Sequence, residues 1–370
     1  MPRRAPLGSW LRIRRESQVQ TNLNSRAGSS TSTPRRARAS VPAMERTSLL
    51  IVALWSVLGL CACAAKSGAG STSAIGSGID IETMRPPDAA RVISEFQTKY
   101  GVTPIPTRTR PVTSMAEALD IVRGDRFPEF QQAREFMAGK QGPEALSVRS
   151  YLETSGAGAF LLAAAILEEE RRRDLTELRQ ITQSRPLENR EDGISDQDRA
   201  EGLRAKNVDL RKVIRALNVL SEAPLMSGAN LAEQAVRQDP QSQLAYLANA
   251  NYYRIRERWL EFDRMMGYAD NTEGGENRAL KTYLRAMEAL VRYTDPAKCK
   301  ALLEASLAQS PGFVRAQANL VLVERAVEDS YAQLQKLREM NPQHIVVSLA
   351  GPMIEREYFA AVEFENARRN

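Results

Sequence analysis

The feature that most constrains the fold is an almost unbroken series of helical patterns from about Ile79 to the end of the chain. Segments such as DAARVISEFQTKY and PEFQQAREFMAG place apolar residues three and four positions apart, with a Pro, Ser or Asp at the start. Strands need apolar residues at every second position, and that alternation is scarce here. The sequence therefore predicts an all-α fold whose helices bury one face against their neighbours.

The longest apolar segment of this part, GAGAFLLAAAILEEERRRDLTELRQ, predicts one long helix with a buried first half. Its three Glu (168–170) and three Arg (171–173) are expected to form ion pairs one turn apart on a solvated face. The polar run between Arg185 and Asn207 predicts a surface connection. It separates an N-terminal helical region (80–185) from a second helical region (205–345), and a C-terminal helix (346–370) follows.

Three predicted helix ends in the second region share an Asp, Ser or Asn followed by Pro, at Pro240, Pro311 and Pro342. Their spacings of 71 and 31 residues are close to two units and one unit of 34. The pattern resembles the tetratricopeptide repeat (TPR), in which each unit pairs two antiparallel helices. The resemblance implies a TPR-like α-solenoid over residues 205–345. A helical array without true repeats remains the alternative, because DNTEGGEN replaces one proline turn.

The TPR resemblance also implies functional positions. Small residues at tight helix crossings are expected to be Ala216, Gly228, Ala235, Cys299 and Ser306. The first helices of TPR units line a concave groove that binds an extended peptide or a partner helix. The partner-binding candidates on this frame are Leu244, Leu247, Asn251, Arg254, Lys281 and Glu288. The Leu side chains are candidate apolar anchors, the Asn could hydrogen-bond a partner backbone, and the Arg could pair with a carboxylate.

The twelve uncharged residues from Leu49 to Leu60 are too short for a membrane span, which needs about 20 residues. Their length instead suits the apolar core of a signal peptide. The sequence from Leu60 to Cys63 resembles a bacterial lipobox, which implies cleavage before Cys63 and acylation (palmitate) of that residue. We therefore expect a disordered Arg-rich extension (1–43), a lipoprotein signal peptide starting at Met44 (44–62) and a flexible linker (63–79).

This processing changes the charge balance. The whole chain carries +6 with a pI of about 9.3, but residues 1–43 alone carry +8, which leaves −2 for residues 63–370. A nucleic-acid partner is therefore not expected unless residues 1–43 are retained. Cys299 is then the single free thiol, so no intramolecular disulfide can form.

Catalytic signals are weak. The single histidine, His344, follows a helix-ending Pro and is expected at the surface, and no Cys, Asp or His lies at metal-ligand spacing from it. No strand and no Gly-Lys-Ser/Thr accompanies Gly274-Gly275, so a phosphate-binding loop is not indicated. We expect no catalytic residue, no metal and no cofactor, and hence not an enzyme.

The sequence thus predicts a membrane-anchored extracytoplasmic lipoprotein that binds protein partners of the cell envelope, as an interaction scaffold or assembly factor. The alternative is an accessory subunit that presents substrate to an envelope transporter or enzyme. An open concave face mixing Leu with Asn and Arg favours the scaffold, and a mainly apolar groove that is closed at one end favours the accessory subunit. If the source has two membranes, Ala64 after the acylated Cys favours the outer membrane, facing the periplasm.

Overall fold

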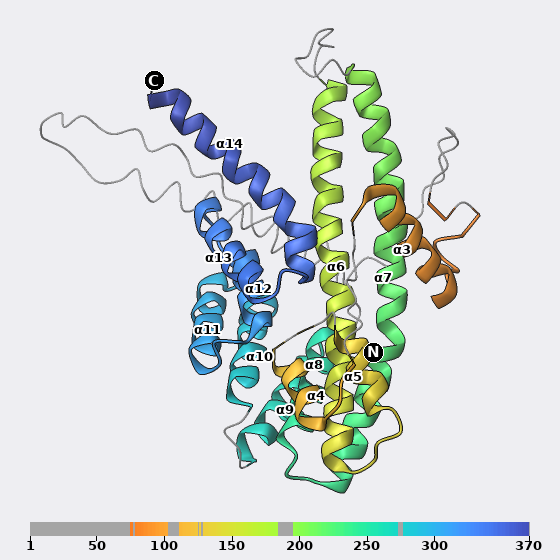
Figure 1. Cartoon of the computed structure of the whole chain (residues 1–370), viewed down its shortest axis with the longest axis vertical. Helices are drawn as coiled ribbons and strands as arrows, with labels where there is room; N and C mark the ends of the chain where they lie inside the picture. Colours follow the sequence, from red (N-terminus) through yellow and green to blue (C-terminus); the bar gives the residue numbers. More distant parts are fainter. Residues whose placement is uncertain are drawn as a thin grey trace, which may run out of the picture. The chain divides into compact units, whose positions relative to one another are not determined.

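The computed structural model describes residues 75–76, 78–102, 111–124, 126, 129–183, 195–272 and 277–369. Every regular element in these ranges is helical, so the all-α prediction is confirmed (Figure 1). Residues 1–74, which include the predicted extension, signal peptide and Cys63, lie outside the described ranges. The elements are α3 (Pro86–Tyr100), α4 (Met115–Arg123), α5 (Phe130–Met137), α6 (Pro143–Gln183), α7 (Asp196–Gln238), α8 (Gln243–Ile255), α9 (Trp259–Asn271), α10 (Arg278–Val291), α11 (Pro296–Gln309), α12 (Val314–Val323), α13 (Val327–Met340), η2 (Val346–Ala350) and α14 (Gly351–Arg369).

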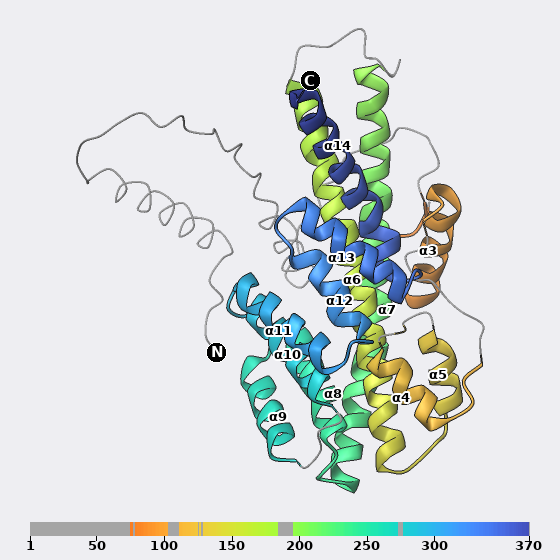
Figure 2. The ribbon, with the colours of Figure 1, turned by 60° about the vertical axis from the view of Figure 1, so that its left-hand side comes forward.

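The centre of the fold is a long antiparallel hairpin of α6 and α7, which lie side by side along most of their length (Figures 1 and 2). α6 has 41 residues and α7 has 43. The long helix expected from its apolar and charged halves is confirmed, and it starts earlier because PEALSVRSYLET continues into it. Close approach is possible at Gly228 of α7, where an added Cβ would lie 2.9 Å from the Ser150 carbonyl oxygen of α6.

Helix α7 corrects two predictions. The polar run expected as a surface connection is helical from Asp196 onward, because its charged side chains pair with α6: Arg199 Nε donates to Glu177 at 2.6 Å, and Lys206 Nζ lies 2.6 Å from Glu170. The unit expected to end at Pro240 is this one continuous helix and not a two-helix hairpin. Pro224 lies in its interior, where proline removes one backbone hydrogen bond without ending the helix.

Three helical hairpins follow: α8–α9, α10–α11 and α12–α13. Their first helices begin at Gln243, Arg278 and Val314, starts that are about 35 residues apart. Pro311 and Pro342 follow the second and third hairpins, as expected. The turns inside the first two hairpins each hold one residue with a left-handed backbone, Glu257 and Thr294, both at φ 53°. The two turns therefore reverse the chain with a similar local geometry.

All five small residues expected at helix crossings are buried, namely Ala216, Gly228, Ala235, Cys299 and Ser306. The small residues of α7 pack against other helices than the TPR resemblance implies. Gly228 packs against Ser150 and Thr154 of α6, and Ala235 lies in an apolar cluster with Leu146 of α6 and Ala245 of α8. These small residues therefore allow close packing within the α6–α7 hairpin as well as within the hairpin array.

The beginning of the described chain is fixed to the core, which corrects the predicted flexible linker at its C-terminal end. Ile75 is buried, its N–H donates to Asp209 Oδ1 at 3.0 Å, and its carbonyl accepts from Lys212 Nζ at 2.8 Å. Asp209 also accepts from Lys99 Nζ and the Tyr100 hydroxyl of α3, both at 2.7 Å. The chain therefore joins the folded unit at residue 75, four residues before the predicted boundary.

The Glu and Arg triplets of α6 form the expected pairs, with Arg171 on Glu168 and Arg173 on Glu169. Their face is not solvated: Glu168 and Glu169 are buried. Glu170 pairs with Lys206 of α7, and Arg173 pairs with Glu357 of α14. This charged stretch thus joins three helices.

Among the described helices, α6 alone is long and apolar enough to cross a bilayer, and 72% of that apolar window is buried inside the protein. Burial of this kind is typical of the core helix of a globular unit. The finding is therefore weak evidence for a membrane span.

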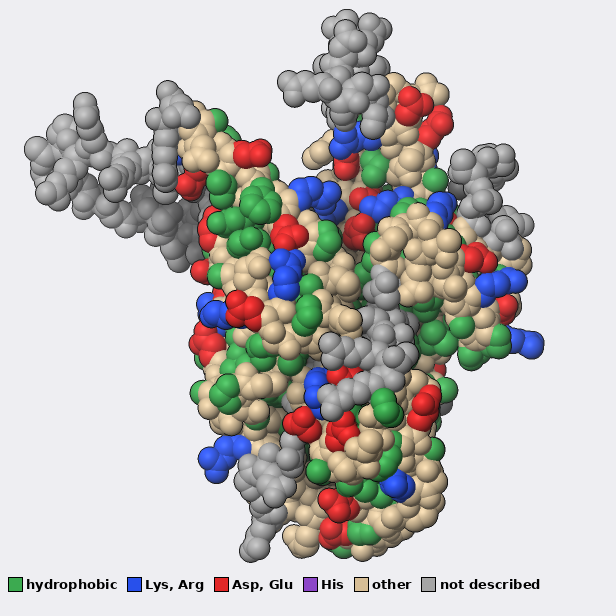
Figure 3. All heavy atoms as spheres, in the orientation of Figure 1, with side chains coloured by type: hydrophobic (Ala, Val, Ile, Leu, Met, Phe, Trp, Pro, Cys, Tyr) green, Lys and Arg blue, Asp and Glu red, His purple; other side chains and the backbone are tan. Residues whose placement is uncertain are grey.

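The C-terminal region corresponds to η2 and α14. The start of α14 packs against η2 and α13, and its second half extends away from them (Figure 2). Phe359, Val362 and Phe364 are exposed there. Hydrophobic side chains reach the surface in this region in the space-filling view (Figure 3).

Candidate functional site

A cavity of about 100 Å³, partly open to solvent, lies between α6 and the first helices of the three hairpins. α6 contributes Gly158, Ala159, Leu161, Leu162 and Ala165 to the lining. α8 contributes Asn251, Arg254 and Ile255; α10 contributes Tyr283, Met287 and Val291; α12 contributes Arg315, Ala318 and Asn319; and His344 and Ile345 complete it. The inner helices of the array therefore converge on one site, and α6 covers that site.

Arg254 is the central cationic group of the cavity. Its Nε and Nη2 both donate to Asn251 Oδ1, at 3.2 and 2.8 Å, and this contact fixes the guanidinium one turn along α8. Burial, with the nearby charge of Arg315 adding to it, lowers the pKa of the Arg254 guanidinium from its usual value. An arginine nevertheless stays protonated in proteins, so the positive charge remains inside the cavity.

Arg315 of α12 supplies a second guanidinium, with only 8% of the residue exposed. Its Nη1 donates to Ser155 Oγ of α6 at 3.2 Å, and its Cζ lies 5.9 Å and 5.8 Å from the ring centroids of Tyr151 and Tyr283. Cation–π contacts of this kind partly compensate a desolvated cation. They also hold Arg315 in a fixed place between α6, α10 and α12.

The hydrogen bonds of the remaining polar groups orient the lining. Asn319 Nδ2 donates to the Tyr283 hydroxyl at 3.3 Å and to the Arg315 carbonyl at 2.9 Å. The Tyr283 ring also contacts Phe313 edge to face, with centroids 5.4 Å apart. Buried polar side chains held in this way keep a defined geometry.

His344 corrects the sequence prediction of a surface residue, because it is buried, with 1% exposed, and lines the cavity. Its Nδ1 accepts the backbone N–H of Val346 at 3.2 Å. In the neutral ring the proton is therefore on Nε2. The π-helix η2 starts two residues later, an irregularity that is frequent beside functional sites.

The structure brings together only part of the predicted groove. Asn251 and Arg254 line the cavity. Leu247 is fully buried in the main core and is not available as an anchor for a partner. Leu244 is partly buried against that core and does not line the cavity. Lys281 and Glu288 do not line the cavity.

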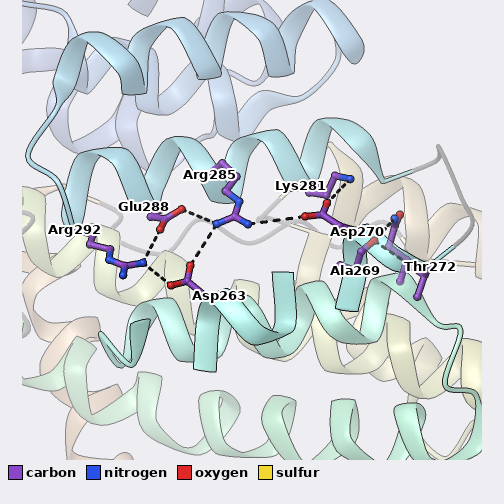
Figure 4. Close-up of polar contacts among 9 residues, drawn as sticks. Asp263, Ala269, Asp270, Thr272, Lys281, Arg285, Glu288 and Arg292 are labelled. Carbon is purple, nitrogen blue, oxygen red and sulfur yellow. Dashed lines mark hydrogen bonds and ion pairs between the residues drawn. The ribbon is translucent and has the colours of Figure 1, made fainter. Parts of the chain in front are cut away.

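Lys281 and Glu288 belong to an ion-pair network between α9 and α10 (Figure 4). Lys281 Nζ is 2.8 Å from Asp270, and Glu288 accepts from both Arg285 and Arg292 at 2.9 Å. Asp263 of α9 completes the network by pairing with the same two arginines. These side chains are engaged within the hairpin array and away from the cavity.

The lining combines guanidinium, amide and imidazole groups with aliphatic side chains. The lining includes no Asp or Glu among the residues that the structure describes, and no group of metal-binding side chains occurs in those ranges. Cys299 is buried, and burial raises the pKa of its thiol to about 12, so it is a poor nucleophile at neutral pH.

In comparisons with known proteins, no family model, curated protein or solved structure matches this chain.

Proposed function

We propose that this chain is a lipid-anchored, extracytoplasmic binding protein that holds a small ligand between α6 and a TPR-like hairpin array and presents it to a partner in the cell envelope. The observation that carries the proposal is the convergence of α8, α10 and α12 on one cavity that α6 covers on one side. Of the two functions expected from the sequence, a cavity that is covered on one side and has a largely aliphatic wall favours the substrate-presenting accessory subunit.

The TPR-like part of the proposal is supported by three consecutive hairpins with starts about 35 residues apart. Their first helices all contribute to one surface, which is the surface used by solenoids for binding. The array is short, and α6 packs where a partner peptide is expected to lie.

The anchoring part is supported by the lipobox-like sequence from Leu60 to Cys63 and the polar, Gly- and Ser-rich stretch after it. The proposed address is the outer membrane facing the periplasm, if the source has two membranes. Acyl chains supply about 0.8 kcal/mol of membrane affinity per buried CH₂, so Cys63→Ser should release the protein into the soluble fraction. Retention of the variant on membranes after salt and carbonate washes contradicts acylation of Cys63.

Native mass spectrometry tests the ligand-presenting function. The full chain extracted from its own membranes in mild detergent should carry a non-covalent adduct that disappears on denaturation. Ala318→Phe fills the cavity and should remove the adduct, whereas Ala297→Phe on the exposed face of α11 should keep it. Ala159→Leu is a second cavity variant for the case that Ala318→Phe does not fold. Absence of any adduct from the wild type, or an adduct that persists in both cavity variants, contradicts the proposal.

The interaction scaffold is a second candidate function, and the exposed side chains of α14 favour it: Phe364 is 64% exposed and Phe359 is 52% exposed. Exposed apolar side chains grouped on one element often mark a protein contact. A photo-crosslinking residue at position 364 should give one adduct of defined mass in cells, and the same residue at Ala297 should give none. Equal crosslinking at both positions contradicts a specific contact.

A further inference from the structure

The cavity contains one guanidinium group, that of Arg254, with no counter-charge among the described residues. Two guanidinium groups line it, and Arg254 has no ion pair with any Asp or Glu in the described ranges; its hydrogen bonds there go to the neutral Asn251. Bringing a guanidinium group out of bulk water costs free energy unless an opposite charge or strong hydrogen bonds compensate. A bound anion provides that compensation.

The rest of the lining restricts what kind of anion fits. Leu161, Leu162, Ile255, Met287 and Val291 make much of the wall aliphatic. A dry apolar cavity of 150 Å³ is known to hold a ring the size of benzene, so a site of about 100 Å³ suits a ligand of a few non-hydrogen atoms. A ligand with one anionic end and a short apolar body matches both the arginines and the aliphatic wall.

We infer that this cavity binds a small aliphatic carboxylate, with the Arg254 guanidinium as its main anchor; the inference rests on the proposed ligand-presenting function. A carboxylate matches the planar fork of a guanidinium through two parallel hydrogen bonds. Asn251 Oδ1 accepts from the Nε and Nη2 side of the guanidinium, which leaves Nη1 and the second N–H of Nη2 as the pair of donors for a carboxylate. Arg315, Asn319 and His344 are further polar residues of the lining. Inorganic phosphate, which has no apolar part, fits the aliphatic wall less well.

The test compares probes of matched shape on the full chain. Butyrate, butyramide and inorganic phosphate are titrated by calorimetry in a buffer free of carboxylates and phosphate. Butyrate should bind saturably, and butyramide, which has the same shape without the charge, should bind at least tenfold more weakly. Arg254→Met should weaken butyrate binding at least tenfold. Arg264→Met, at an exposed position on α9, should leave it unchanged.

Each other result overturns the inference in a defined way. Equal butyrate affinity in the wild type and Arg254→Met contradicts the role of Arg254 as the anchor. Tighter binding of phosphate than of butyrate contradicts a carboxylate as the ligand. Equal binding of butyramide and butyrate contradicts an anionic ligand, although the cavity would still bind a small molecule. The inference is also overturned if none of the three probes binds. The proposed function is tested separately, by the adduct in native mass spectrometry. If Arg254→Met does not fold, Arg254→Lys keeps the charge without the fork and should still lose affinity.

Discussion

Gly228 of α7 gives the sharpest test of the central hairpin. A Cβ at this position would lie 2.6 Å from Thr154 Cγ2, 2.9 Å from the Ser150 carbonyl oxygen and 3.0 Å from the Thr154 backbone nitrogen of α6. The methyl group of Thr154 can rotate away, but the two backbone atoms cannot. Gly228→Ala must therefore push α6 and α7 apart by a few tenths of an ångström.

The expected magnitude combines two opposing effects. Overpacking a closely packed site costs about 1–3 kcal/mol. Replacing Gly by Ala inside a helix gains about 0.5–1 kcal/mol, because Gly loses more backbone entropy on folding. The two ranges combine to a net loss of about 0–2.5 kcal/mol, and a loss near the middle of that range, about 1 kcal/mol, lowers Tm by roughly 2–4 °C for a unit of this size.

Gly202 provides a matched control in the same helix. Nothing lies within 4 Å of a Cβ added at Gly202, so Gly202→Ala should show only the helix gain and raise Tm by roughly 1–3 °C. Thermal unfolding followed by far-ultraviolet circular dichroism measures both variants under identical conditions. The reasoning is refuted if Gly228→Ala raises Tm as Gly202→Ala does, because the close approach of α6 and α7 is then not a packing constraint.

Three further perturbations test other parts of the fold. Asp209→Asn removes the negative charge that accepts from Lys99, Tyr100 and the Ile75 N–H. It should lower the free energy of unfolding, measured by urea denaturation, by about 1–3 kcal/mol and speed proteolysis near residue 75. Unchanged stability contradicts the attachment of residue 75 to the core. Thr294→Gly relieves a left-handed backbone at an exposed turn and should raise Tm by a few degrees, and a fall in Tm shows that the turn is unstrained. Burial raises the pKa of the Cys299 thiol above its value in the unfolded chain, so the folded state keeps its proton to higher pH. This contribution to stability is complete below about pH 8.5 and declines as pH rises toward about 12, and the decline should be smaller in Cys299→Ala. Equal pH dependence of the two proteins contradicts the burial effect.

The sequence was sufficient for the features that depend on local pattern. Helical periodicity is a property of one segment, so the all-α class and the long α6 could be predicted from it. The Pro turns at Pro311 and Pro342 follow the ends of second helices, because the residue before a proline is biased away from the α conformation, and both were identified correctly. Asn319 could also have been found, because it lies two 34-residue units after Asn251 and both line the cavity.

The wrong predictions depend on partners far away in the chain. The polar start of α7 indicated a loop because the acids that pair with Arg199 and Lys206 lie on α6, and no local pattern shows that pairing. Lys281 and Glu288 were placed in a groove from their position in the repeat, but Asp270 and the arginines of α10 hold them in the α9–α10 network. His344 was assigned to the surface because it follows the helix-ending Pro342, whereas the tertiary structure buries it beside the cavity.

The packing of α6 also bears on which kind of ligand the inner face can accept. A partner helix could enter the array only by displacing α6, whose Leu146, Leu152, Ile166 and Leu167 are almost completely buried. Burying each of these side chains contributes about 1.5–3 kcal/mol, so the four together contribute about 6–12 kcal/mol. That range is comparable to the whole binding free energy of a micromolar to nanomolar complex, about 8–12 kcal/mol. A small ligand entering the cavity leaves these contacts intact, and for that reason the inner face favours a small molecule over an exchanged helix.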